Sequence, residues 1–339
     1  MSTSRNHQKT ENSAQQQILR ASPQQAHITL AIIVPCFNEE ATVTAVVKRF
    51  ANAAPEAAIF VVDNASTDNT AKNAKEAGAT VLTQILSGKA HAIRHAFANI
   101  DADTYVMVDG DDTYDADIVM LMVDNLINRQ LDMVVGKRSN APTAAYRFGH
   151  QIGNKVFNAF FRMMFGGNFQ DIFSGYRVFS RRFVKSFPIQ SRGFEIETEL
   201  SFHALSLRMQ VVEIDTKYKE RPVGSTSKLN TYVDGIRIVS TMIQLMRYNK
   251  PMLFYGSFAM VFGAVSIFLG LPIVWHFFET GLVPKFPSLI VSVGFLILAA
   301  ISFMCALILD AMLRFQNEAR MLAYIQSSGP DAQKIKPPA

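Results

Sequence analysis

The sequence predicts an α/β domain with a mainly parallel sheet, followed by two transmembrane helices. Between Ile28 and Arg138, short apolar runs typical of strands alternate with stretches of helical character. Regular alternation of strand and helix is typical of a parallel sheet that carries helices on its faces. Closer to the C-terminus, the stretches 251–278 and 286–309 contain no Asp, Glu, Lys or Arg. Each is longer than the roughly 20 residues that a helix needs to cross the hydrocarbon core of a bilayer.

The elements expected in the α/β part follow one another in order. Apolar, β-branched runs predict strands over 28–35, 57–63, 79–84, 104–110 and 132–138. The stretches that separate them predict helices over 39–54, 70–77, 89–98 and 116–129. Sheets of this kind bind their ligands at the carboxyl ends of the strands, so a site is expected in the loops that follow the strands.

Two amphipathic segments come after this alternating part. Apolar residues recur at helical spacing in 149–167, where Lys155 and Arg162 accompany the aromatic side chains. Two interpretations stay open for this segment: a wholly buried helix, or an interfacial helix that lies on the bilayer. The segment 232–249 is a second amphipathic element, and it leads directly into the first apolar span.

The chain therefore divides into five expected parts. These are a polar, disordered tail rich in Gln and Ser, the α/β domain, a juxtamembrane amphipathic helix, a transmembrane helical hairpin and a C-terminal tail: 1–26, 27–230, 231–250, 251–313 and 314–339. The opening residues have the composition of a disordered segment and not of a signal peptide.

The basic residues predict the orientation of the hairpin. Five of them flank its two ends on one side: Arg237, Arg247, Lys250, Arg314 and Arg320. The connector between the spans offers only Lys285. Positive residues concentrate on the cytoplasmic side of a membrane, so we expect a multi-pass protein of the inner (cytoplasmic) membrane with its α/β domain and both termini in the cytosol. The net charge of +5 is modest, and the membrane surface is a simpler partner for it than nucleic acid.

Polar residues follow three of the expected strands. The segments are VPCFNEE after the first, VVDNASTDNT after the second and VMVDGDDTYDA after the fourth. Any one of them alone is ordinary turn and cap chemistry. Because three of them converge on one edge of the sheet, they predict a site for a polar ligand. Four carboxylates gather in the third segment, at Asp109, Asp111, Asp112 and Asp115, and a divalent cation is the expected reason.

Two other phosphate- or metal-binding motifs do not fit. An EF-hand loop that began at Asp109 would have Tyr114 where glycine is required and Met120 where the bidentate glutamate belongs. A Walker loop around the SGKA segment would have Thr83 in place of its leading glycine and Ala90 in place of its serine or threonine.

The order of several segments resembles a known family. These are VPCFNEE, DNASTDNT, GKAHAIRHAF, DGDD, GKR, QDIFSGYRVFSRRF and RPVGSTSKL. Together they resemble the inverting family 2 glycosyltransferases of the dolichyl-phosphate mannose synthase kind. The bacterial polyprenyl-phosphate glycosyltransferases with a C-terminal two-helix membrane hairpin are the most similar, over about residues 28–315. The resemblance implies the GT-A fold of nucleotide-diphospho-sugar transferases.

The resemblance also implies a donor site. Asp109 and Asp111 would form the DXD motif that holds Mg²⁺ or Mn²⁺ against the diphosphate of a UDP- or GDP-sugar. The nucleotide-sugar site would be lined by Pro35, Asn38, Glu39, Asp63, Lys89 and Asp109. Two positions depart from the family pattern: Asn64 replaces a second aspartate, and Thr113 stands where a glutamine is common.

The second half of the α/β domain is expected to bind the acceptor. Cationic and hydroxyl side chains suited to a lipid-linked phosphate are Arg138, Ser174, Arg177, Arg221, Ser225, Ser227 and Lys228. Asp171, Glu195 and Glu197 are candidates for a carboxylate near the reaction centre. Of these, the predicted catalytic residues are Asp171 and Glu197, with Asp171 favoured as the one that positions the site. Asp112 and Asp115 are expected to cap helices or to support the site.

These inferences predict a membrane-anchored, metal-dependent inverting hexosyltransferase. It would move one sugar from a UDP- or GDP-sugar to polyprenyl phosphate, undecaprenyl or dolichyl, on the cytosolic leaflet. Two alternatives stay open: a transferase that extends a lipid-linked or polysaccharide acceptor, and a non-catalytic subunit that binds nucleotide-sugar. The first is disfavoured because the Gln-x-x-Arg-Trp motif of processive relatives is missing: the single tryptophan, Trp275, lies inside the first span. Whether the chain forms a homo-oligomer stays open.

Overall fold

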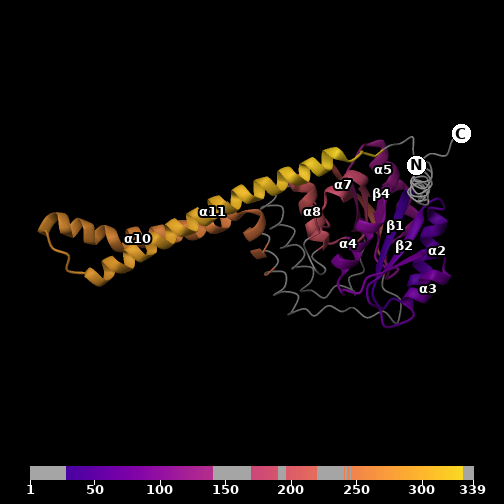
Figure 1. Ribbon diagram of the computed structural model, residues 1–339, viewed down its shortest axis with the longest axis horizontal. Helices are drawn as coiled ribbons and strands as arrows, with labels where there is room; N and C mark the ends of the chain where they lie inside the picture. Colours follow the sequence, from indigo (N-terminus) through magenta and orange to yellow (C-terminus); the bar gives the residue numbers. More distant parts are fainter. Residues whose placement is uncertain are drawn as a thin grey trace, which may run out of the picture.

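The structure is a computed structural model, and it consists of a sheet domain joined to two long helices (Figure 1). It describes residues 28–139, 169–189, 196–219, 240, 243–244 and 246–330. The expected amphipathic segments 149–167 and 231–250 lie wholly or largely outside these ranges, and so does the expected tail 1–26.

The domain is built on one seven-stranded sheet. Its strands are β1 (Ile28–Cys36), β2 (Ala58–Asp63), β3 (Thr80–Thr83), β4 (Ala102–Met107), β5 (Met133–Ser139), β6 (Arg177–Ser180) and β7 (Val211–Lys217). Their order across the sheet is β3-β2-β1-β4-β6-β5-β7. All neighbours pair in parallel except β6, which is antiparallel to both β4 and β5. The predicted α/β class with a mainly parallel sheet is confirmed, and β6 and β7 are additions to the expected strands.

The four helices expected over 39–129 are present with shifted ends, and among the described residues α7 (Arg181–Ser186) and α8 (Ile196–Ser206) are additions to them. The others are α2 (Val43–Ala53), α3 (Thr70–Glu76), α4 (Lys89–Asn99), the 3₁₀ turn η1 (Ala116–Ile118) and α5 (Val119–Asn128). The helix expected from residue 39 begins only at Val43, because residues 39–42 form a turn in which Thr42 N–H donates to the Glu39 carbonyl over 3.1 Å. The helix expected over 116–129 is divided into η1 and α5. Asp115 caps η1 by accepting from Asp117 N–H over 3.2 Å.

Helices cover both faces of the sheet. Alternate residues of β1 point to opposite sides, so that Ile33 packs in one hydrophobic cluster and Ile32 in the other. The first cluster includes side chains of α4, α7 and α8, and the second includes side chains of α2 and α5. Burial on both faces explains why β1 is an almost continuous apolar run.

The two long helices are α10 (Pro251–Thr280) and α11 (Phe286–Gln326). By length and composition both could cross a membrane, and only 17% and 11% of their most apolar windows are buried. They pack against each other as an antiparallel pair (Figure 1). At their contact, Ser266 and Ser292 each donate a hydroxyl hydrogen bond to the other's carbonyl over 2.9 Å. A Cβ at Gly270 would lie 2.5 Å from the Ser292 hydroxyl, so a glycine is needed for this close approach.

Helix α11 extends well beyond its apolar stretch. It runs without a break to Gln326, so residues 314–326 are helical, and its end returns to the sheet domain beside α7 (Figure 1). There Tyr324 donates a 3.1 Å hydrogen bond to the carboxylate of Asp132, and the guanidinium of Arg182 lies over the tyrosine ring. The end of α11 is therefore fastened to the domain by side-chain contacts.

Candidate functional site

The three polar segments expected at one edge of the sheet do meet there. In the sheet register Cys36 at the end of β1 is opposite Asp63 at the end of β2, and Ile33 is opposite Met107 at the end of β4. The Thr42 hydroxyl joins the first loop to the third by donating to the carbonyl of Gly110 over 2.7 Å. The topology thus places VPCFNEE, VVDNASTDNT and VMVDGDD side by side.

A buried thiol reports how acidic this edge is. Burial raises the pKa of Cys36 well above its usual value, and the carboxylates of Glu39, Asp63, Asp109 and Asp111 raise it further. The thiol therefore stays protonated at neutral pH and is unsuited to act as a nucleophile. A Cβ at Gly110 would lie 2.5 Å from its sulfur, so the glycine between Asp109 and Asp111 is a packing requirement.

Lys89 lies at the centre of the site. Its ammonium is 2.5 Å from Oδ1 of Asp109 and 2.5 Å from Oε1 of Glu197, and its side chain is 11% exposed. Burial opposes the charge on Lys89, but the two carboxylates outweigh it and raise the pKa of the ammonium above its usual value. The Asp109 side chain is 30% exposed, against 7% for that of Glu197. Three of the predicted site residues thus form one ion-pair cluster, with Asp109 on its more open side.

The other three carboxylates of VMVDGDDTYDA, which we call the acidic segment, each have a partner of their own. Asp111 is buried and accepts from the Thr113 hydroxyl over 2.6 Å. Asp112 has a positive φ of 59° and pairs with Arg49 over 2.5 Å. Since Lys89 pairs with Asp109 and Asp115 caps η1, the gathering of carboxylates is stabilised by separate local contacts. Within the described ranges, no three His, Cys, Asp or Glu side chains are grouped so that they could hold a metal ion.

Asn64, the first residue after β2, holds the loop that precedes Lys89. The Asn64 amide donates to the Leu86 carbonyl over 2.6 Å, and its oxygen accepts from Gly88 N–H over 2.7 Å. Gly88, which has φ of 128°, directly precedes Lys89 at the start of α4. The departure from a second aspartate at Asn64 therefore has a structural role, because an ionised aspartate could accept from Gly88 but could not donate to the Leu86 carbonyl.

The other expected donor residues lie at the ends of β1 and β2 or in the loop after β1. Asp63 is buried and accepts from Ser66 N–H over 3.3 Å. Asn38 has a positive φ of 54°, and its side chain accepts from Thr67 N–H over 2.8 Å. Glu39 N–H donates to the Thr70 hydroxyl over 2.8 Å, and the half-buried Pro35 lies at the end of β1. These contacts hold the loops after β1 and β2 together, and we call the surface formed by Pro35, Asn38, Glu39 and Asp63 the donor wall.

Arg138 and Asp171 form a second ion pair, further along the same edge. The guanidinium donates to both oxygens of Asp171, over 2.8 and 2.7 Å, and the Arg138 backbone N–H donates to the same carboxylate over 3.1 Å. The N–H groups of Gln170 and Asp171 in turn donate to Glu213 on β7. Because both of its oxygens are engaged, Asp171 has the contacts of a positioning residue more than those of a base.

Comparisons with known proteins agree with this architecture. Residues 31–187 match the family model described as glycosyl transferase family 2. The glycosyltransferase AglJ of Haloferax volcanii is 33% identical over 250 residues, which cover 73% of this chain and 82% of AglJ. The chain belongs to glycosyl transferase family 2.

A second relative and a solved structure extend the comparison. The undecaprenyl-phosphate mannosyltransferase of Micrococcus luteus is 25% identical, over 61% of this chain and 90% of that protein. Glucosyl-3-phosphoglycerate synthase of Mycobacterium tuberculosis, crystallised with Mn²⁺, uridine-diphosphate-glucose and phosphoglyceric acid, superposes with a TM-score of 0.50 and 18% identity. The match covers 65% of this chain and 80% of that structure. The likeness supports the GT-A-type fold of this family 2 enzyme.

Two residues expected to bind lipid phosphate are inside the family 2 domain. Ser174 and Arg177 are fully buried. The Ser174 hydroxyl donates to the Gly136 carbonyl over 2.6 Å, and Arg177 donates to the Ser201 hydroxyl and to the carbonyls of Ser174 and Ile172. Burial lowers the pKa of Arg177 to about 10, so it remains charged at neutral pH. Both side chains therefore brace the SGYR turn from inside the domain.

Four other expected phosphate ligands, Arg221, Ser225, Ser227 and Lys228, lie outside the described residues, as does Glu195. The structure adds two site residues that sequence reasoning missed. A Cβ at Gly175 would collide with the Asp109 carboxylate, and Gly175 N–H donates to the Tyr114 hydroxyl over 2.9 Å. The SGYR motif was the available signal for Gly175. Tyr114 had none, because a tyrosine in an acidic loop reads as a surface residue.

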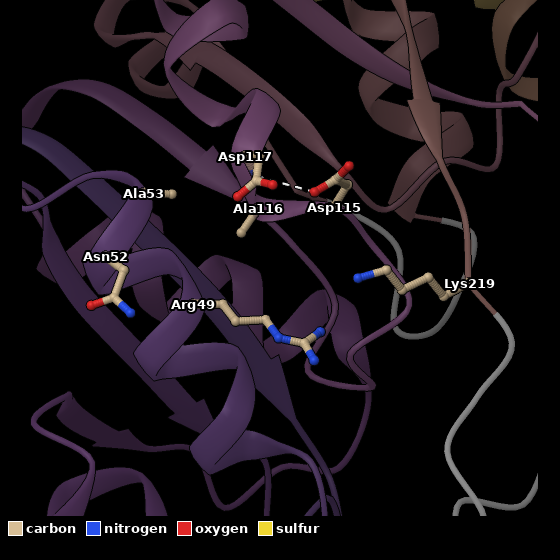
Figure 2. A pocket seen from close by; sticks show the side chains of 7 residues that line it. All are labelled: Arg49, Asn52, Ala53, Asp115, Ala116, Asp117 and Lys219. Carbon is tan, nitrogen blue, oxygen red and sulfur yellow. Dashed lines mark hydrogen bonds between the residues drawn. The ribbon is translucent and has the colours of Figure 1, made fainter.

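A separate polar pocket of about 360 Å³ lies at the end of the acidic segment, where Asp115 lines it. Its lining residues come from α2, η1 and the end of the β7 region: Arg49, Asn52, Ala53, Asp115, Ala116, Asp117 and Lys219. Figure 2 shows the carboxylates of Asp115 and Asp117 beside each other, with the cations of Arg49 and Lys219 below them. None of the residues expected to bind donor or acceptor lines this pocket.

Proposed function

We propose that this glycosyltransferase is a membrane-anchored, inverting hexosyltransferase that moves one sugar from a UDP- or GDP-sugar to polyprenyl phosphate on the cytosolic leaflet. The observation that carries the proposal is the union, in one chain, of a family 2 site with two helices long and apolar enough to span a membrane. A lipid acceptor explains why a sugar-transferring domain is attached to such helices. The relative from Micrococcus luteus, an undecaprenyl-phosphate mannosyltransferase, supports this acceptor class.

Asp109 and Asp111 are the residues we propose to hold Mg²⁺ or Mn²⁺. Asp109 is partly open, and two carboxylates leave coordination positions for phosphate oxygens, as Mg²⁺ sites with nucleotides commonly do. The ion would offset the charge that develops on the departing nucleoside diphosphate. The fold neighbour from Mycobacterium tuberculosis was crystallised with Mn²⁺ and a nucleotide-sugar, which favours this cofactor class.

On the donor side, the donor wall formed by Pro35, Asn38, Glu39 and Asp63 is proposed to receive the nucleotide, with Lys89 close to the diphosphate. Asp63 lies at the end of β2, where its remaining acceptor capacity suits the N–H groups of a base. Lys89, at the first residue of α4, adds an ammonium at the place where the helix dipole also favours an anion.

On the acceptor side, the chemistry demands cations more than a base. A phosphate monoester has a second pKa near 6 and is largely a dianion at neutral pH. Its oxygen would attack the anomeric carbon, and the bond from that carbon to the diphosphate would break, with the electron pair leaving on the nucleoside diphosphate. Arg138, held in place by Asp171, is proposed to orient the lipid phosphate together with Arg221, Ser225, Ser227 and Lys228.

The experiment that tests the proposal is a transfer assay. Purified full-length protein in detergent, with Mn²⁺ and undecaprenyl phosphate, would receive a panel of radiolabelled UDP- and GDP-sugars. We expect an organic-extractable labelled product from one donor, and its loss in Asp111→Asn and after chelation of the metal. Label only in a polymeric or water-soluble product would favour the acceptor-extending alternative. Nucleotide-sugar binding without any product would favour the non-catalytic one.

A further inference from the structure

We propose that Lys89 is an exchangeable counter-ion at the donor site. With no donor bound it neutralises Asp109, and when the donor binds it moves from Asp109 to the diphosphate, which frees the carboxylate for a divalent cation. This inference rests on the proposed function, since it assumes that a diphosphate and a divalent cation arrive together. It assigns Lys89 a role before donor binding as well as after it.

The first argument is that one cation serves two carboxylates from different elements. Asp109 follows β4 and Glu197 lies on α8, yet both reach the same ammonium over 2.5 Å. Removing Lys89 would leave two carboxylates facing each other in a largely buried place, which is strongly unfavourable. Such a pair attracts any replacement cation. Lys89 therefore neutralises both carboxylates when no metal ion is bound, and a metal ion can replace it at Asp109.

The second argument concerns which partner can move. The other oxygen of Asp109 lies against Gly175, where even a Cβ would collide with it, so the carboxylate has little room to rotate away. Lysine, in contrast, carries its charge on a flexible four-carbon stem with three equivalent donors. Glu197 keeps a hold on the ammonium when Asp109 releases it. In this exchange Glu197 acts through its contact with Lys89, as a positioning residue.

The third argument is electrostatic. A divalent ion on Asp109 would lie within a few ångströms of the Lys89 ammonium, and like charges that close repel each other strongly when one of them is as buried as Lys89. The lysine and the ion are thus competitors for one carboxylate. A diphosphate resolves the competition because its oxygens accept hydrogen bonds from the lysine and ligate the ion together.

The test measures Mn²⁺ alone, without nucleotide or lipid. Binding to the full-length protein in detergent would be followed by the loss of the free-ion signal in electron paramagnetic resonance. We expect Lys89→Met to bind Mn²⁺ at least about fivefold more tightly than wild type, the low end of ordinary coupling between sites. Lys89→Arg, which keeps the charge, should not gain affinity. Lys185→Met is the matched control, because it removes the same charge from a surface pair with Asp101.

The affinity for the nucleotide should change in the opposite direction to the affinity for Mn²⁺. With saturating Mn²⁺, Lys89→Met should bind UDP or GDP more weakly in calorimetry, because the diphosphate has lost its ammonium. Unchanged or weaker Mn²⁺ binding in Lys89→Met would overturn the exchange and make Lys89 a fixed structural ion pair. If that variant does not fold, Lys89→Met/Glu197→Gln removes both buried charges. It should still bind Mn²⁺ more tightly than Glu197→Gln, and equal affinities would overturn the proposal.

The inference and the proposed function can fail separately. A protein that transfers no sugar to lipid can still show tighter Mn²⁺ binding in Lys89→Met, in which case only the acceptor proposal falls. Lipid-linked product that forms after chelation, with no Mn²⁺ bound by any variant, would overturn the exchange and leave the transferase in place.

Discussion

At the scale of single residues, the site depends on close contacts that allow little change in side-chain size. Gly110 and Gly175 both have ordinary negative φ, so neither is there for backbone freedom. They are glycines because the Cys36 sulfur and the Asp109 carboxylate occupy the space that a Cβ would need. The DXD and SGYR segments therefore constrain each other's positions.

Gly175→Ala tests this constraint. The added methyl group should displace the Asp109 carboxylate, and a shift of about 1 Å in a catalytic group can cost roughly 100-fold in rate. We expect a loss of this order in kcat/KM for transfer, together with a thermal unfolding midpoint lowered by overpacking worth about 1–3 kcal/mol. Gly256→Ala, where nothing lies within 4 Å of the new Cβ, should retain full transfer activity. Equal activity of the two variants would contradict the packing argument.

His203 predicts how stability depends on pH. Burial lowers its pKa to about 3, with a smaller contribution from Arg320 in the same direction. The unfolded histidine titrates near pH 6.5, so between these values the unfolded chain binds more protons and stability falls as the pH falls. For this group alone we expect about 2 kcal/mol less free energy of unfolding at pH 5 than at pH 7.

The measurement is the difference in thermal unfolding midpoint between pH 7 and pH 5. His203→Gln cannot titrate and should show a smaller difference than wild type, whereas His95→Gln on α4 should keep the wild-type difference. The prediction fails if wild type and His203→Gln lose the same stability on acidification.

At the scale of elements, the acceptor side is held by contacts between a loop and two strands. Glu213 on β7 receives the N–H groups of Gln170 and Asp171, and Asp171 then receives Arg138 at the end of β5. Parallel pairing of β5 with β7 brings these groups together. The loop is thus positioned by the sheet, and Arg138 is positioned by the loop.

Asp171→Asn tests this arrangement. Removing one partner of a largely buried ion pair costs about 3–5 kcal/mol, because the other charge is left without compensation. We expect Arg138 to lose its fixed orientation, so that the KM for polyprenyl phosphate rises more than the KM for the nucleotide-sugar. Asp215→Asn is the control, since its pair with Lys137 is exposed and should be worth less than 1 kcal/mol. If the KM for the nucleotide-sugar rises more than the KM for polyprenyl phosphate, Asp171 supports the donor site and not the acceptor site, and the prediction is wrong.

At the scale of the whole molecule, the end of α11 is part of the α/β domain. The buried carboxylate of Asp132 accepts from Ser180, Arg182 and Tyr324, and Tyr324 also packs against the hydrophobic cluster on the α7 and α8 face. Gln130 donates to the Pro330 carbonyl over 3.0 Å just beyond the helix. The end of α11 and the residues just after it thus contact the α/β domain through Tyr324 and Pro330, in addition to the covalent connection through α10.

Tyr324→Ala should loosen this connection. It removes a hydrogen bond to a buried carboxylate and a cation–π contact, together worth about 2–4 kcal/mol. We expect a lower thermal unfolding midpoint and new proteolytic cleavage within 314–330. Tyr324→Phe keeps the ring and the cation–π contact, so it should lose only the hydrogen-bond share, about 1.5–3 kcal/mol. If Tyr324→Ala leaves both readouts unchanged, the docking of α11 contributes nothing to stability.

Most of the α/β framework could be predicted because its signals are local. Apolar runs followed by polar turns mark β1, β2 and β4, and their parallel pairing places Asp63, Lys89 and Asp109 at one edge. Other features depend on tertiary contacts that no local pattern reports. β6 is four residues long and inserts antiparallel between β4 and β5, and Arg177 within it is a charged residue in a core. Asn64 read as a departure from a donor motif, although its amide holds the loop before α4.

The length of α11 also sets a distance. Its 41 residues span roughly 60 Å at 1.5 Å per residue, about twice the thickness of a hydrocarbon core. If residues up to 313 lie in the bilayer, residues 314–326 stand outside it as about 20 Å of helix that ends on the α/β domain. A change in bilayer thickness alters the tilt of transmembrane helices. Because α11 continues to the α/β domain, such a tilt would change the height of the domain above the membrane. The reach from Arg138 to the plane of the lipid phosphates would then follow the mechanics of the membrane as well as the chemistry of the site.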